Sequence, residues 1–218
     1  MEKIYEHGGN IYEITPRKRG SILDFSANIN PLGIPLGVKR LLHRHLDDLV
    51  FYPDPKNRLF TTTLAQYWKI KDENILVGNG STELIYLVFN AFKESKVTIV
   101  VPSFTEYERA AKISNCKLQF ITLKENKYFC LDPTFIKITD ILLICNPNNP
   151  TGNFIISKWQ NLLDIPAKKI FIDEAFMDFV SNENAYTFIP LAVSSKKIIV
   201  FRTFTKFFAL APVCGLGI

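Results

Sequence analysis

The sequence is poor in the residues that bind metals and form disulfide frameworks. Only three histidines and four cysteines occur among its 218 residues, and no two cysteines form a Cys-x-x-Cys pair. No zinc-ligand spacing can be drawn from so few residues, so we predict no metal site. Cys145 closes an apolar run, which is typical of a buried small hydrophobic residue.

Long apolar stretches and clustered basic charge are also absent. No apolar run approaches the roughly 20 residues that a membrane helix needs, so we predict no membrane partner. The first six residues contain no apolar signal core, which favours a reducing, cytoplasmic setting. The net charge of +5 comes from 26 basic and 21 acidic residues scattered in small groups. Nucleic-acid-binding proteins concentrate their basic residues, so this spread predicts no nucleic-acid partner.

What the sequence does contain is a globular composition with several short apolar runs. Hydrophobic residues make up 47% and charged residues 22%, the usual balance of a folded protein. The runs are nearly continuous rather than alternating, which indicates strands of a parallel sheet that is covered on both faces. They span residues 97–101, 118–121, 141–144, 170–172 and 198–201.

Helix-like stretches precede and separate these runs. They span residues 36–46, 58–68, 83–93, 106–115 and 157–163. Strands that alternate with helices predict an α/β fold, in which helices sandwich a mostly parallel sheet and the crossovers are right-handed.

Polar residues follow four of the predicted strands directly. Phe104 follows the first run, Asn146–Gly152 the third, Asp173 the fourth and Lys206 the fifth. In an open α/β sheet, ligands bind beyond the carboxyl ends of the strands. An aromatic ring, an amide, a carboxylate and an amine at one edge therefore predict a binding site.

A fifth polar element, Gly78–Glu83, precedes an apolar helix. Small residues at a helix start let backbone N–H groups bind an anion, although a plain turn with an N-cap is the commoner interpretation. The other elements also have structural interpretations, as a helix cap, a turn or a surface lysine. Lys206, however, lies among three phenylalanines, and apolar surroundings lower the pKa of an amine and make it nucleophilic.

The order and spacing of Asn146–Gly152, Asp173–Ala175 and Thr203–Lys206 resemble the class I/II (fold type I) pyridoxal-phosphate aminotransferases. Within that superfamily the chain is similar to the branch that holds threonine-phosphate decarboxylase and histidinol-phosphate aminotransferase. Phe176 stands where the aminotransferase usually has a tyrosine. Four segments resemble the decarboxylase: residues 7–10, 25–33, 78–84 and 104–110.

The resemblance implies pyridoxal 5'-phosphate as cofactor and a role for each matched residue. Lys206 would form the Schiff base and move protons at the substrate α-carbon, and Asp173 would pair with the pyridine nitrogen. Asn149 would donate to the ring oxygen, Phe104 would stack on the ring, and Phe176 would lie beside it. The phosphate would be held by Gly80, Ser81, Thr82 and Thr203, and by Tyr52 of a neighbouring subunit in a homodimer. The implied contacts to a small phosphorylated amino-acid substrate are His7, Gly9, Asn30 and Asn149.

The implied reaction is loss of CO2 from threonine O-3-phosphate, which gives aminopropanol phosphate for cobalamin biosynthesis. The alternatives are a histidinol-phosphate-type aminotransferase and a catalytically impaired remnant. We expect residues 1–45 to contribute to the substrate site and to a small domain. Residues 46–218 would then form the cofactor-binding large domain, incomplete at its C-terminus.

The stretch after Lys206 departs from the family pattern. Cys214 or Gly215 stands where the family has an arginine that clamps the cofactor phosphate. We expect the small C-terminal domain to be largely missing, the strand beside the lysine-bearing strand to be absent, and the activity to be low.

Overall fold

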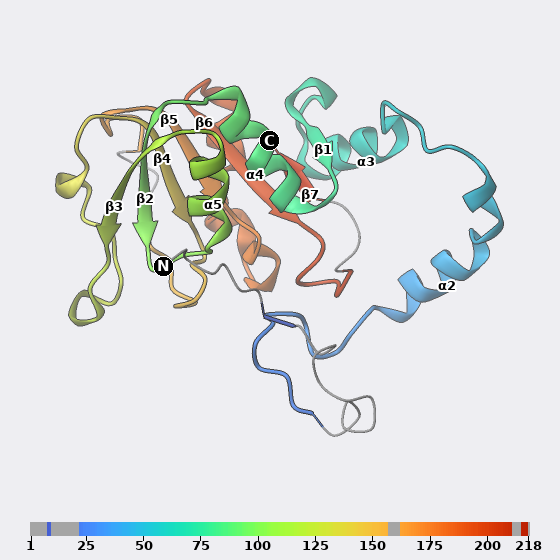
Figure 1. The fold of residues 1–218 in the computed structure, drawn as a ribbon. Helices are drawn as coiled ribbons and strands as arrows, with labels where there is room; N and C mark the ends of the chain where they lie inside the picture. The colour runs from blue at the N-terminus through green and yellow to red at the C-terminus, as the bar shows by residue number, and fades with distance from the viewer. Residues whose placement is uncertain (1–7, 10–21, 157–161, 211–214, 218) are drawn as a thin grey trace.

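A seven-stranded sheet organises the structure, a computed structural model that describes residues 8–9, 22–156, 162–210 and 215–217. The strand order is β1-β7-β6-β5-β4-β2-β3, and Figure 1 shows helices packed against the sheet. The strands are β1 (Leu76–Gly78), β2 (Lys96–Val101), β3 (Lys117–Thr122), β4 (Thr139–Cys145), β5 (Ala167–Asp173), β6 (Ile198–Thr203) and β7 (Gly215–Gly217).

The helices lie mainly between consecutive strands. The α-helices are α2 (Leu36–Arg44), α3 (Arg58–Trp68), α4 (Gly80–Ala91), α5 (Glu106–Ile113) and α6 (Ile189–Ser194). Short 3₁₀ helices are η2 (Asp47–Val50), η3 (Asp72–Asn74), η4 (Glu125–Lys127), η5 (Pro133–Phe135), η6 (Met177–Phe179) and η7 (Glu183–Ala185). The helix predicted over 58–68 is confirmed residue for residue. Most of the helix predicted over 157–163 lies outside the described residues.

The five predicted strands are confirmed as β2 to β6, which all pair in parallel. The prediction that the further strand beside β6, the strand that leads to Lys206, is absent is wrong. β7 pairs antiparallel with β6, with Gly215 opposite Thr203, and β7 also pairs with β1. β1 and β7 have three residues each and include glycine, so neither presents an apolar run that sequence patterns would detect.

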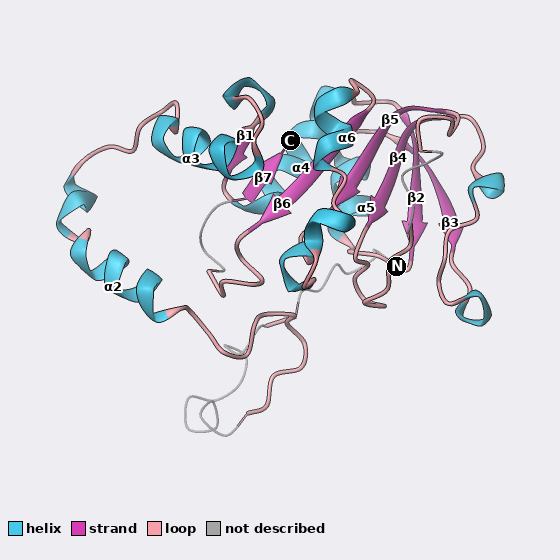
Figure 2. Cartoon of the chain, turned by 180° about the vertical axis from the view of Figure 1, so that it is seen from behind, coloured by secondary structure: helices cyan, strands magenta, loops and turns pink. Residues whose placement is uncertain are grey.

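The near-continuous apolar strands supply two cores because successive side chains point to opposite faces of a sheet. On one face, Ile141 and Leu143 of β4 pack in a cluster with residues of α4 and α5. On the other face, Leu142 and Ile144 pack in a cluster that includes Ile189 of α6. Figure 2, seen from behind, shows α6 on the face opposite to α4 and α5.

Residues 22–57 form an arm that extends away from the sheet before the chain returns at α3 (Figure 1). α2 lies on this arm and buries none of its residues. The arm approaches the sheet through Asn28 and Asn30, described below. The division of the chain near residue 45 stays a prediction.

Candidate active site

A cavity of about 220 Å³ lies at the carboxyl edge of β4, β5 and β6. We call it the central cavity. It brings together most of the residues predicted from the strand ends and from the start of α4. The predicted residues that line it are Gly80, Ser81, Thr82, Phe104, Asn149, Asp173, Phe176 and Lys206.

Asp173, the last residue of β5, is buried and fixed by two hydrogen bonds. Its Oδ1 accepts from the backbone N–H of Ala175 at 2.8 Å, and its Oδ2 accepts from the Tyr107 hydroxyl at 2.6 Å. Burial raises the pKa of Asp173, while these two hydrogen bonds and the nearby Lys206 amine oppose the increase. The two hydrogen bonds thus fix the orientation of the carboxylate, and together with Lys206 they stabilise its ionised form.

Lys206 follows β6 in a turn and lines the same cavity. Burial lowers the pKa of Lys206, and attraction to Asp173 partly offsets this effect. The lowered pKa increases the neutral, nucleophilic fraction of the amine at neutral pH. The arm holds this turn, because Asn30 donates its backbone N–H to Lys206 O at 3.0 Å and its side-chain Nδ2 to Phe207 O at 2.9 Å.

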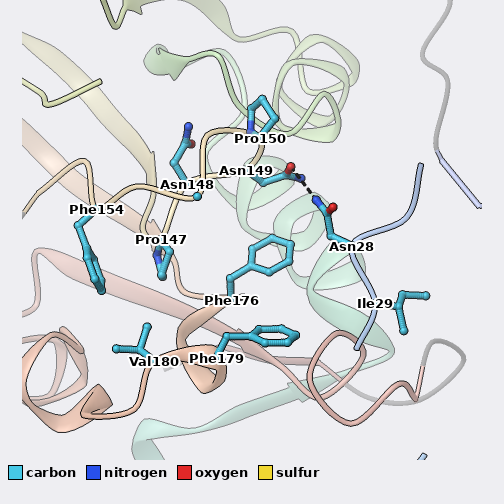
Figure 3. Close-up of a pocket in the computed structure, with 11 residues that line it drawn as sticks. Asn28, Ile29, Pro147, Asn148, Asn149, Pro150, Phe154, Phe176, Phe179 and Val180 are labelled. Atoms are coloured by element: carbon cyan, nitrogen blue, oxygen red, sulfur yellow. Dashed lines mark hydrogen bonds between the residues drawn. The ribbon is translucent and has the colours of Figure 1, made fainter. Parts of the chain in front are cut away.

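The three asparagines of the Asn146–Gly152 loop have different tasks. Asn146 Oδ1 accepts from the backbone N–H groups of Ile155 and Ile156, and Asn148 Nδ2 donates to Pro102 O at 3.0 Å. These two side chains hold the loop in place. Asn149 lines the central cavity, and its Oδ1 accepts from Asn28 Nδ2 at 3.1 Å, as Figure 3 shows.

The start of α4 offers the cavity an anion-binding end. Gly80 has φ +80°, a left-handed conformation that favours glycine, although a Cβ there would meet no atom within 4 Å. The Asn79 side chain forms no cap hydrogen bond, while the Glu83 carboxylate accepts from Asn79 N. The helix dipole and the first N–H groups favour a phosphate at this position. Amine, carboxylate, amide and helix end together suit pyridoxal phosphate.

Two further cavities adjoin the central one. The first, the outer cavity of about 470 Å³, shares Lys206, Asn149 and Phe104 with it and extends to Gly8 and Ser26. The second, the apolar cavity of about 450 Å³, shares Asn149 and Phe176 with the central cavity. Figure 3 shows Phe176 and Phe179 side by side at the apolar cavity, below Asn149. The site therefore has room for a substrate next to the cofactor position.

Some predicted residues lie away from the central cavity. Thr203 is buried and does not line the cavity, whereas Thr205, whose backbone N–H donates to Thr203 Oγ1 at 3.3 Å, does. Tyr52 is 99% exposed on the arm. The backbone N–H of Gly9 donates to Ser26 Oγ at 2.7 Å. The predicted substrate residue His7, and Cys214, lie outside the described residues.

The sequence interpretation gave no role to Tyr107, Thr205 or Asn28, which all lie at the site. Tyr107 carried a usable signal, because it follows Phe104 by three residues at the start of a helix, a spacing that places side chains together. Asn28 carried none, since its partner Asn149 is 121 residues away. Among the described residues, no three histidine, cysteine, aspartate or glutamate side chains are arranged so that they could hold a metal ion. None of the helices in those ranges has the length and apolarity of a membrane span.

Behind the site, a buried cluster joins β5 to β6. Arg202 donates to Glu174 at 3.2 Å, to Asp178 at 2.7 Å and to Glu183 at 2.6 Å. Its guanidinium also lies 5.8 Å from the centre of the Trp68 ring. Burial raises the pKa of Glu174 to about 7, even though Arg202 opposes that increase. The cluster thus has one cation for three carboxyl groups.

The fold and this constellation define a class: an α/β protein with a lysine and a buried aspartate at one cavity, as in pyridoxal-phosphate enzymes. Comparison with known proteins agrees. A family model described as aminotransferase class I and II matches residues 21–213. The chain belongs to this family, whose members use pyridoxal phosphate.

Three relatives indicate the branch of the family. Threonine-phosphate decarboxylase from Salmonella typhimurium is 38% identical over 97% of this chain and 60% of that enzyme. The adenosylcobalamin biosynthesis bifunctional protein CobDQ from Leptospira interrogans is 33% identical over 98% of this chain and 26% of that protein. The crystal structure of histidinol-phosphate aminotransferase from Clostridium acetobutylicum has a TM-score of 0.79 and 35% identity, covering 90% of this chain and 60% of that one. The chain thus spans about 60% of the length of this decarboxylase and this aminotransferase.

Proposed function

We propose that this chain supplies the cofactor-binding part of a pyridoxal-phosphate enzyme that decarboxylates threonine O-3-phosphate. The observation that carries the proposal is the central cavity, where Lys206 and Asp173 lie on the walls and the start of α4 lies at the side. The two side chains lie near enough to each other to interact electrostatically.

Each wall of the cavity then has a task. Lys206 Nζ would hold the cofactor aldehyde until the substrate amine replaces it, and Asp173 would pair with the protonated ring nitrogen. Asn149 donates to the ring oxygen, since Asn28 already bonds its Oδ1 and leaves Nδ2 available. Phe104 would cover the ring face, and Gly80–Thr82 would hold the phosphate, because the helix dipole favours negative charge there.

The reaction at the substrate α-carbon requires one proton transfer from the protein. When bound, pyridoxal phosphate withdraws electrons from the α-carbon and so weakens its bond to the carboxylate carbon. CO2 would leave, and Lys206 Nζ, which the substrate amine would have replaced at the cofactor aldehyde, would donate the proton that takes its place on the α-carbon. The lowered pKa of Lys206 suits this exchange, because burial makes the ammonium form of Lys206 a better proton donor.

The substrate would occupy the outer cavity, next to Lys206 and Asn149. His7, Gly9, Asn30 and Asn149 remain the proposed substrate contacts. For Asn30 the side chain is already engaged, since its Nδ2 donates to Phe207 O and its Oδ1 accepts from Leu32 N. Its contribution would therefore be to hold the Lys206 turn rather than to bind phosphate directly.

The likeness to the Salmonella decarboxylase and to the Leptospira cobalamin protein supports decarboxylation, with aminopropanol phosphate for cobalamin biosynthesis as the product. The second candidate is a histidinol-phosphate-type aminotransferase, which the structural likeness to the Clostridium enzyme supports. Phe176 favours the first candidate, because it carries no hydroxyl for the ring oxygen.

A single-turnover assay separates the two candidates. The full chain is incubated with pyridoxal phosphate and carboxyl-labelled threonine O-3-phosphate, and in parallel with histidinol phosphate. Labelled CO2 together with an equal amount of aminopropanol phosphate supports decarboxylation. Conversion of the cofactor to pyridoxamine phosphate without CO2 supports the aminotransferase. Neither product, from protein that has bound the cofactor, contradicts both.

We also propose a homodimer in which Tyr52 reaches the cofactor phosphate of the neighbouring subunit. In support, the arm exposes many large apolar side chains, among them Leu36, Leu49, Phe51 and Tyr52 itself. Exposed apolar side chains gathered on one segment of the chain are typical of a protein interface. Sedimentation equilibrium tests the proposal: a stable dimer that Leu49→Asp and Phe51→Asp dissociate supports it, and a monomer at micromolar concentration contradicts it.

A further inference from the structure

We propose that Tyr107 is a positioning residue that holds Asp173 ionised and oriented toward the ring nitrogen of the cofactor. The inference rests on the proposed function, because it takes Asp173 as the partner of that nitrogen. The Tyr107 hydroxyl takes no direct part in the proposed reaction, and its proposed role is to orient Asp173.

The geometry around Asp173 carries the inference. Tyr107 lies in the first turn of α5, is fully buried, and lines the central cavity. Its hydroxyl donates to Asp173 Oδ2, while the backbone N–H of Ala175 donates to Oδ1. Each carboxylate oxygen thus receives one hydrogen bond from a different direction, which fixes the plane of the carboxylate. Each oxygen keeps a lone pair with which to accept from a ring N–H group.

The predicted stacking ring, Phe104, lies two residues before the start of α5 and contacts Tyr107. Phe104 and Tyr107 pack edge to face, with ring centres 5.6 Å apart and planes at 86°. The proposed cofactor-covering ring of Phe104 is therefore coupled by direct contact to Tyr107, whose hydroxyl orients Asp173. A displacement of α5 would move both together relative to Lys206.

The hydrogen bond from Tyr107 to Asp173 matters because, among the described residues, few positive charges lie near this buried acid. Asp173 is buried, and the positive charge of Lys206 lowers its pKa and so stabilises its ionised form. Lys206 becomes part of a covalent bond when it holds the cofactor, so the acid then depends more on its hydrogen bonds and on the ring nitrogen. A neutral Asp173 could not form an ion pair with a protonated ring nitrogen, so the positive charge of the ring would be disfavoured.

The Tyr107 hydroxyl and the Cys145 thiol near Asp173 both stay uncharged. Burial, together with the charge of Asp173, raises the pKa of the Tyr107 hydroxyl well above its ordinary value. The same two causes raise the pKa of the nearby Cys145 thiol to about 12. Both groups therefore keep their protons at neutral pH and do not compete with Asp173 for the negative charge.

The test removes the hydroxyl and keeps the ring. In Tyr107→Phe we expect the dissociation constant of pyridoxal phosphate to rise about 10-fold to 100-fold, the range for a hydrogen bond to a charged group. The matched control is Tyr86→Phe, because the Tyr86 hydroxyl also donates to a buried carboxylate, Glu106 Oε2 at 2.7 Å, away from the cavity. We expect that control to bind the cofactor as the wild type does.

A double-mutant cycle shows whether Tyr107 acts through Asp173. In an Asp173→Asn background, Tyr107→Phe should leave the cofactor affinity unchanged, since no charge remains to be held. An analogue of pyridoxal phosphate with carbon in place of the ring nitrogen gives a second check. The difference between wild type and Tyr107→Phe should vanish for this analogue.

A measurement on cofactor-free protein separates this inference from the proposed function. Infrared spectra of the Asp173 carboxyl group, recorded at a series of pH values, should give a higher Asp173 pKa in Tyr107→Phe than in the wild type. Tyr107→His restores a hydrogen-bond donor and should reverse part of that increase. If the pKa is unchanged, or if Tyr107→Phe and Tyr86→Phe weaken cofactor binding equally, the inference is overturned. If the wild type fails to bind the cofactor while the Asp173 pKa still rises in Tyr107→Phe as expected, only the proposed function is contradicted.

Discussion

The buried cluster around Arg202 leads to a prediction about how stability depends on pH. Glu174 is fully buried, and its carboxylate accepts from Arg202, from the Thr187 hydroxyl at 2.7 Å and from the backbone N–H of Phe188 at 2.6 Å. Arg202 is shared with Asp178 and Glu183, so its single charge balances three acids only in part. Glu174→Gln keeps the shape of the side chain and removes its proton equilibrium.

The magnitude follows from the pKa of Glu174 in the two states. Burial raises this pKa from its ordinary value of 4.5 to about 7. Between these values the folded protein holds a proton that the unfolded chain has released, so the free energy of unfolding falls as the pH rises. A pKa difference of about 2.5 corresponds to about 3 kcal/mol at 1.36 kcal/mol per unit. This contribution is complete below pH 4.5 and is lost once the pH passes about 7.

Urea unfolding of both proteins at several pH values tests the prediction. With a slope of about 2 to 3 kcal/mol per molar urea, the midpoint of the wild type should fall by roughly 1 M relative to Glu174→Gln between pH 4.5 and 7.5. Comparing the two proteins cancels the groups that they share, including Asp173 and Asp178, whose pKa values burial also raises. Parallel curves for the two proteins would refute the reasoning.

Three further predictions concern the site, the core and the arm. Lys206→Ala should keep its circular dichroism spectrum but carry no cofactor after borohydride reduction; a labelled variant would disprove the assignment of Lys206. Leu143→Ala in the fully buried centre of β4 should lower the free energy of unfolding by about 2 to 5 kcal/mol, measured in urea, whereas Leu87→Ala on the half-exposed side of α4 should cost far less. At a cofactor concentration too low to load the Tyr52→Phe homodimer, a random mixture of Tyr52→Phe and Lys206→Ala subunits should show about a quarter of the wild-type activity, since one site of each mixed dimer is then intact. No gain over the unmixed variants would contradict the exchange of Tyr52 between subunits.

The central strands could be predicted from the sequence because burial on both faces leaves a near-continuous apolar run. Residues 141–144 were predicted as a strand, and β4 extends this by only a few residues. β7 could not be predicted in this way. Two of its three residues are glycine, and it is positioned by hydrogen bonds to β6 and β1 rather than by a pattern of its own.

The candidate site could be predicted in part for a similar reason. Lys206, Asp173 and Asn149 each follow a recognisable strand, and parallel strands present their carboxyl ends at one edge of a sheet. The contribution of the arm could not be predicted, because Asn28 and Asn30 reach the site only through contacts that span more than a hundred residues. Thr203 was predicted at the phosphate, but strand geometry buries it and leaves Thr205 on the wall.

The two acids at the end of β5 have separate tasks because neighbouring residues of a strand face opposite sides of the sheet. Asp173 points with Phe171 toward α5, where Tyr107 meets it, and Glu174 points the other way toward Arg202. We therefore expect Asp173→Asn to weaken cofactor binding while leaving the Glu174-dependent fall of stability between pH 4.5 and 7 in place. Glu174→Gln should abolish this fall of stability and leave cofactor binding unchanged. Cofactor titration and urea unfolding of the two variants measure both effects, and loss of cofactor affinity in Glu174→Gln comparable to that in Asp173→Asn would show that the two faces of the sheet are not independent.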